Sequence, residues 1–108
     1  VFRLSEAVLI AAEAALKTGA DAAAYLNMLR RNRIQEYEDV ASVTMDDIIN
    51  ERRKELFAEG QIAFDYWRNG LAVVKDGFTV GPHDGKTMLQ IPKEEIDLAK
   101  GRLIQNPL

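Results

Sequence analysis

The chain contains no cysteine among its 108 residues. This absence excludes disulfide bonds, thiol nucleophiles and zinc sites built on thiolates, and it leaves the redox compartment undecided. An excess of positive charge is also missing, because 14 Lys and Arg residues stand against 17 Asp and Glu residues, for a formal net charge of -3. No general basic field is therefore available to hold a phosphate backbone, and nucleic acid is not expected as a partner.

Long hydrophobic runs are missing too. The longest apolar stretch, residues 7–16, is rich in alanine and is interrupted by Glu13, whereas a membrane-spanning helix needs about 20 apolar residues. No basic region followed by an apolar segment and a small-residue cleavage site is present, so no targeting signal is expected within the chain. The sequence begins with Val1 rather than Met, and we therefore expect it to derive from a longer precursor.

The composition that remains is typical of one globular unit. Hydrophobic residues make up 47% of the chain and charged residues 29%, as in an ordinary folded domain rather than a disordered chain. A chain of this length can bury one core. We expect a single unit over residues 1–108, mainly α, with helical hairpins over about residues 2–69 and an irregular or extended tail over residues 70–108.

Two helices are predicted at the start of this unit. The first runs from Phe2 to about Thr18 and is apolar over much of its girth. Gly19 ends it, and Asp21 can cap a second helix from Ala22 to about Asn32. The two helices are predicted to form a tetratricopeptide-like αα-hairpin. The apolar residues of the first helix fall on one face, Leu4, Ala7, Ala11, Ala14 and Ala15, and on a face beside it, Leu9, Ala12 and Leu16.

A third and a fourth helix are predicted to form a second hairpin of the same kind. Thr44 stands three residues before Asp47, which is a capping-box pattern with Asp in the acidic position. Gly60 marks a break, and residues 61–67 continue as a short fourth helix. The apolar stripe of the third helix contains Met45, Ile48, Ile49 and Leu56.

The last third of the chain changes character. Residues 71–74 and 78–80 read as short strands on either side of a turn. Residues 88–92 are expected to be extended, because the residue before a proline is pushed away from helical geometry. Residues 93–100 are predicted to form a short helix, and the irregular end, residues 103–108, must dock on another segment to be ordered.

Three carboxylates, Glu51, Glu55 and Glu59, recur every four residues and so lie along one side of the third helix. Di-metal sites in helical bundles use such spacing, but they add a Glu-x-x-His element. The only histidine, His83, lies in a Gly/Pro turn far along the chain, so no metal site is predicted. We interpret the acids as ion-pair partners of the basic residues at positions 52–54.

Arg52 lies on the apolar stripe of the third helix, where an unpaired buried charge is costly. If it is buried it needs an acidic partner, and the candidates are Glu13 on the first helix and Glu55 or Glu59. The alternative is that Arg52 binds a ligand carboxylate. A structural ion pair between the hairpins is the preferred interpretation.

The aromatic residues concentrate around Phe64 and Trp67. Aromatic rings beside polar side chains can stack on sugar faces, so carbohydrate contact is one interpretation. The preferred one is that both rings, three residues apart on a helix, fill the core of the second hairpin. No nucleophile, base and acid constellation accompanies His83, and no Gly-rich phosphate loop is present. Neither a catalytic residue nor a cofactor is predicted.

Four ordered blocks of residues carry a more specific pattern. The most specific is residues 48–61, which read Ile-Ile-Asn-Glu-Arg-Arg-Lys-Glu-Leu-Phe-Ala-Glu-Gly-Gln and are followed by Phe64 and Asp65. The others are residues 3–7 with 12–14, residues 25–27 with 29–33, and residues 91–92 with 95–96 and 105–107. Together these blocks resemble the C-terminal part of the SusD/RagB family of outer-membrane nutrient-binding lipoproteins. Ile62 and Ala63 depart from the family pattern, which commonly has a basic residue followed by an aromatic one.

The resemblance implies a longer, lipid-anchored parent protein at the outer surface of a Gram-negative cell, with tetratricopeptide-like hairpins as its scaffold. It implies a glycan as ligand, a SusC-like TonB-dependent transporter as partner, and binding rather than catalysis. The family's ligand-contacting residues lie mostly outside the helical scaffold and match no position here, so the glycan site is expected outside this chain. The motif residues are interpreted as structural ion pairs: Glu13, Glu51, Arg52, Glu55 and Glu59.

An alternative from another class is a free-standing tetratricopeptide-like adaptor that holds a peptide between its hairpins. Such repeat proteins need about three units and caps, and the sequence shows two hairpins before it becomes irregular. A small enzyme is the third possibility.

Overall fold

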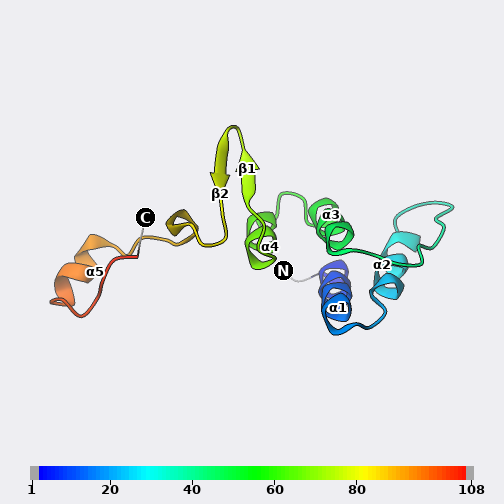
Figure 1. The fold of residues 1–108 in the computed structure, drawn as a ribbon, viewed down its shortest axis with the longest axis horizontal. Coiled ribbons are helices and arrows are strands. Elements are labelled where there is room, and N and C mark those ends of the chain that lie inside the picture. Colours follow the sequence, from blue (N-terminus) through cyan, green and yellow to red (C-terminus); the bar gives the residue numbers. More distant parts are fainter. Residues whose placement is uncertain (1–2, 107–108) are drawn as a thin grey trace. The chain divides into compact units, whose positions relative to one another are not determined.

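The computed structural model describes residues 3–106 (Figure 1). Residues 1, 2, 107 and 108, where the predicted first helix begins and the predicted tail ends, lie outside this range. The chain divides into two compact units, Val1–Ile62 and Ala63–Leu108. Over residues 3–106 the regular structure consists of five α-helices, one short 3-10 helix and two strands, which confirms the predicted mainly α fold class.

The first unit begins with two antiparallel helices, α1 (Leu4–Thr18) and α2 (Ala22–Arg31). Gly19 takes a left-handed conformation with φ 74°, which a glycine adopts without the Cβ clash of other residues, and this ends α1. The Asp21 side chain then accepts a hydrogen bond from the Ala24 backbone N–H at 3.0 Å and caps α2. The predicted hairpin is confirmed, with both of its local signals.

The third helix, α3 (Met45–Glu55), starts at the predicted capping box. The Thr44 hydroxyl accepts from the Asp47 backbone N–H at 3.2 Å, and the Asp47 carboxylate accepts from the Thr44 N–H at 2.8 Å. After Leu56 the chain leaves helical geometry, with positive φ angles of 63° at Ala58 and 75° at Gly60.

The core of the first unit lies where α1 meets both α2 and α3. Its largest fully buried side chains are Leu9 on α1, Leu26 on α2 and Ile48 on α3. The small side chains Ala12 and Ala15 lie against Ile48, which lets α3 approach α1 closely.

Of the two apolar faces predicted for α1, the one that begins with Leu4 is largely exposed, and the neighbouring one with Leu9 and Ala12 is buried. Leu4 is 82% exposed. Because α1 is apolar on two faces, hydrophobic periodicity alone does not select one. The buried face also carries three polar residues, Ser5, Glu6 and Glu13, so it is hard to recognise as buried from the sequence.

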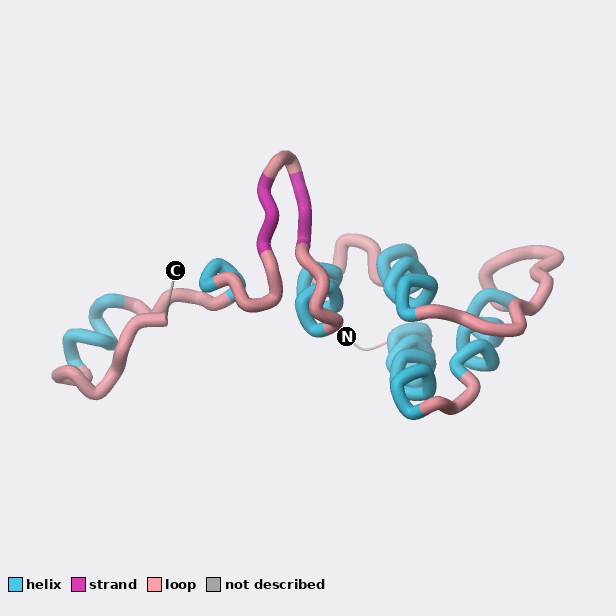
Figure 2. The backbone as a smooth tube through the Cα atoms, viewed as in Figure 1, coloured by secondary structure: helices cyan, strands magenta, loops and turns pink. Residues whose placement is uncertain are grey.

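The second unit contains most of α4 (Ile62–Arg68) and a hairpin of two strands, β1 (Val73–Lys75) and β2 (Phe78–Val80). The strands are antiparallel, with Val73 opposite Val80 and Lys75 opposite Phe78, and Figure 2 shows the tight turn that joins them. Asp76 and Gly77 both have positive φ, 48° and 82°. Positive φ at both central residues is typical of two-residue hairpin turns whose twist matches that of the flanking strands.

The rest of the second unit consists of a 3-10 turn (Gly85–Thr87), α5 (Lys93–Leu98) and an irregular end. Gln105 clamps Ile91 with two hydrogen bonds: its amide donates to the Ile91 carbonyl at 2.9 Å, and its side-chain oxygen accepts from the Ile91 N–H at 2.8 Å. Asn106 donates to the Leu89 carbonyl at 2.6 Å. The described part of the tail therefore docks on residues 89–91.

The second unit buries almost no side chains of its own. Among residues 63–106, Asp65 alone is buried. The prediction that Phe64 fills a core is wrong, because its side chain is 65% exposed. Helical spacing correctly places Phe64 beside Trp67, but spacing says nothing about what covers the pair.

Candidate functional site

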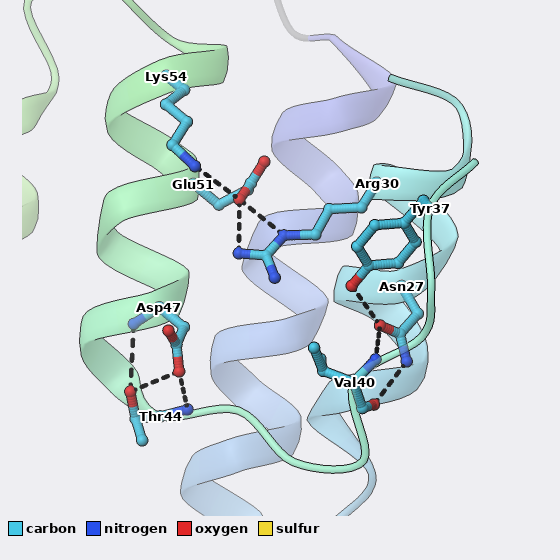
Figure 3. A network of polar contacts seen from close by, with 8 residues as sticks. All are labelled: Asn27, Arg30, Tyr37, Val40, Thr44, Asp47, Glu51 and Lys54. Atoms are coloured by element: carbon cyan, nitrogen blue, oxygen red, sulfur yellow. Dashed lines mark hydrogen bonds and ion pairs between the residues drawn. The ribbon is translucent and has the colours of Figure 1, made fainter. Parts of the chain in front are cut away.

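A polar network connects α2, the loop that follows it, and α3 (Figure 3). Asn27 on α2 is buried, and its amide donates to the Val40 carbonyl at 2.9 Å. Its side-chain oxygen accepts from the Val40 N–H at 3.1 Å and from the Tyr37 hydroxyl at 2.8 Å. One amide thus satisfies both backbone groups of Val40 and fixes the loop to α2. Asn27 was not among the predicted site residues, although it follows Ala23 by one helical turn on the buried face.

Glu51 stands at the centre of the network. Its side chain is 5% exposed, and one of its oxygens accepts from Arg30 Nε at 2.9 Å and lies 2.8 Å from Arg30 Nη2. Lys54 Nζ reaches the same oxygen at 3.5 Å. Figure 3 shows Arg30 extending from α2 to Glu51 on α3. Because the Arg30 side chain is itself only 16% exposed, solvent screens this pair less than a surface ion pair, and removal of either partner would leave a poorly hydrated charge.

The next two acids of the predicted series, Glu55 and Glu59, also form ion pairs with arginines from outside α3. Arg33 donates to Glu55 through Nε at 2.8 Å and Nη2 at 3.2 Å, in a fork that engages both carboxylate oxygens. The hydrogen bonds from Arg33 hold the pKa of Glu55 below its ordinary value, with smaller contributions from Ser5 and Arg3. Glu59 pairs with Arg3.

The partners of the predicted ion-pair residues therefore differ from those that we expected. Within α3 the interleaved partner that the structure shows is Lys54. The closest partners of Glu51 and Glu55 are instead Arg30 on α2 and Arg33, two residues beyond the end of α2. Glu13 is buried on α1 and pairs with Lys17 one turn later at 2.7 Å. Arg52 is 4% exposed, in line with its place on the apolar stripe.

A surface pocket lies on the face of α3 that carries Lys54. It is lined by one residue of α2, four of α3 and one that follows α3: Arg30, Asp47, Asn50, Arg53, Lys54 and Phe57. Phe57 is 82% exposed. Within residues 3–106, no hydrogen bond or ion pair involves the side chain of Arg53 or Asn50. Arg53 was expected to form ion pairs with its neighbours on the helix, and the sequence did not predict this pocket.

Asp47 has a structural task at one end of the pocket. Its carboxylate accepts hydrogen bonds from the Thr44 backbone N–H at 2.8 Å and from the Thr44 hydroxyl at 2.7 Å. These bonds lower the pKa of Asp47, because they favour the charged form of the carboxyl.

The aromatic pair of the second unit is held by the hairpin. The rings of Phe64 and Trp67 meet edge to face, with centroids 5.6 Å apart. Trp67 donates its indole N–H to the Val80 carbonyl at 3.1 Å, which anchors β2 to α4. His83 is exposed. No group of three or more potential metal ligands occurs within residues 3–106, and none of the described helices combines the length and apolar character of a membrane crossing.

Comparison with known proteins gives two matches. The sequence pattern of the SusD family matches residues 1–108. The chain is also similar to the crystal structure of a SusD superfamily protein from Bacteroides vulgatus, with 37% sequence identity and a TM-score of 0.88. That match covers 99% of this chain and 27% of the other, so this chain spans about a quarter of the length of its structural relative. No functionally curated protein matches the chain.

Proposed function

Because the chain belongs to the SusD family, we propose that it is part of a cell-surface protein that binds glycans for nutrient uptake. The observation that carries the proposal is the family match over all 108 residues. The chain contributes binding and scaffolding rather than catalysis, in keeping with a set of polar contacts that links helices to one another.

Within that protein, this chain is the C-terminal helical scaffold of a longer SusD-like polypeptide. The 27% share of the related chain supports a longer parent, as does the second unit, where residues 63–106 bury only Asp65. A segment with so little buried surface of its own gains order when further chain covers it. Glu51, Arg52, Glu55 and Glu59 serve the scaffold as structural ion-pair residues, together with Glu13 on α1.

The parent protein is anchored by a lipid to the outer membrane and faces outward, where it cooperates with a SusC-like TonB-dependent transporter. The glycan is taken from the environment and passed to that transporter for import. These features rest on family membership, and the chain's own residues provide the scaffold that positions the remainder.

The proposal is tested on the protein as it occurs in its source cell. Its intact mass and lipid modification are determined in the outer-membrane fraction, and the purified protein is screened for glycan binding by calorimetry. We expect a lipid-modified species several times heavier than this chain that co-purifies with a β-barrel transporter and binds a glycan. A soluble species of this chain's size that binds peptides and no glycan would support the adaptor alternative instead.

A further inference from the structure

The pocket on α3 contains hydrogen-bond donors, those of Asn50 and Arg53, that nothing in residues 3–106 occupies. Asp47, Asn50 and Arg53 follow one another at intervals of three residues, so their side chains share one face of the helix. The Arg53 guanidinium offers five N–H donors in a planar fork. The Asn50 amide adds two donors and one acceptor.

The carboxylates near this pocket are already engaged. One Asp47 oxygen accepts from the Thr44 N–H and hydroxyl, and one Glu51 oxygen accepts from Arg30 and Lys54. The lining contains three cations, Arg30, Lys54 and Arg53, and one acid, Asp47. Arg30 and Lys54 already pair with Glu51, so Arg53 is the lining cation without an acidic partner in residues 3–106. The local balance favours an anion.

An exposed aromatic ring completes the pocket. Phe57 follows the end of α3, and the left-handed conformation of Ala58 turns the backbone immediately after it. The Phe57 side chain is 82% exposed, which leaves its ring available for stacking on the apolar face of a sugar. An aromatic surface beside a few convergent polar groups is the usual composition of a small-molecule site.

We propose that this pocket binds a uronic acid residue of an acidic saccharide. Arg53 engages the sugar carboxylate through its planar fork, Asn50 hydrogen-bonds a ring hydroxyl, and Phe57 stacks on the sugar face. This inference rests on the proposed glycan-binding function and names the class of glycan. It also places glycan contacts within this chain, whereas the glycan site was expected outside it.

The test measures calorimetric binding of the full-length protein to tri-galacturonate and to the neutral galactose trisaccharide. We expect tighter binding of the galacturonate, and an Arg53→Gln variant that loses roughly ten- to a hundredfold of that affinity, as for a hydrogen bond to a charged group. Phe57→Ala is expected to weaken galacturonate binding about fivefold. Arg102→Gln, at another exposed arginine, is the matched control and should bind like the unchanged protein.

The outcomes separate this inference from the proposed function. Binding of glycans with no preference for galacturonate, or with affinity unchanged in Arg53→Gln, overturns the acidic-saccharide pocket and leaves the glycan-binding function standing. Failure to bind any glycan in a broad screen overturns both. Arg53→Lys, which keeps the charge without the fork, is expected to recover part of the affinity, and thermal melting of each variant shows that it is folded.

Discussion

Removal of the Glu51 carboxylate is expected to destabilise the protein by about 3 kcal/mol. The substitution Glu51→Gln keeps the size of the side chain but withdraws the negative charge from Arg30. Both side chains are shielded, at 5% and 16% exposure, and breaking a buried pair by removing one partner costs about 3–5 kcal/mol. The lower end applies because Arg30 retains some access to water.

The matched control is Lys54→Ala. Lys54 contacts the same carboxylate at 3.5 Å, but its side chain is 68% exposed, so its loss should cost less than about 1 kcal/mol. Urea denaturation at neutral pH gives the free energy of unfolding of each variant, and an unchanged denaturant slope shows that the difference lies in stability.

A double variant measures the interaction energy between Arg30 and Glu51 apart from their other contacts. Arg30→Gln combined with Glu51→Gln should cost clearly less than the sum of the two single changes, because the second substitution no longer leaves a buried charge alone. The reasoning is refuted if Glu51→Gln costs no more than Lys54→Ala, or if the double variant equals the sum.

Three further predictions concern local contacts. Thr44→Ala removes the cap of α3 and should lower the free energy of unfolding by about 1 kcal/mol in urea denaturation; an unchanged midpoint would contradict the capping role. The pKa of Glu55 is lowered in the folded state, so its pairing with Arg33 stabilises the protein above the ordinary value of 4.5 and that stabilisation is lost as pH falls through the folded-state pKa. Glu55→Gln should therefore flatten the acid side of the stability curve, and a curve of unchanged shape would argue against this linkage. Trp67→Phe keeps an aromatic side chain but removes the indole N–H that bonds the Val80 carbonyl, so amide hydrogen exchange in β1 and β2 should accelerate. Equal exchange rates would show that this hydrogen bond does not anchor the hairpin.

The features that the sequence predicted well are those decided by neighbouring residues. The capping box at Thr44 and Asp47, the left-handed stop at Gly19 and the hairpin turn before Phe78 each depend on residues within about four positions of one another. Such local preferences act in the same way wherever the segment lies in a fold. These features can therefore be predicted from the sequence without knowing how the helices pack.

The partners of the acids could not be predicted in the same way. Glu51 is 21 residues from Arg30, and its pairing depends on how α1 holds α2 and α3. The sequence offered Arg53 and Lys54 as closer candidates, and Arg53 instead faces the open pocket. Proximity along a helix favours surface pairs worth a few tenths of a kcal/mol, which a shielded partner from another helix easily outweighs.

The paired acids also explain how the register of α3 is set. The core contacts of α3 with α1 involve small alanine side chains around Ile48, and such a smooth surface resists sliding only weakly. Glu51 and Glu55, one turn apart on α3, meet Arg30 and Arg33, which are three residues apart at the end of α2. A shift of α3 by one residue would turn both carboxylates by about 100° around the helix axis and break both pairs together. The two ion pairs thus select one register for a helix that the apolar contacts alone hold less specifically, and the cost of Glu51→Gln should include a loss of that selection.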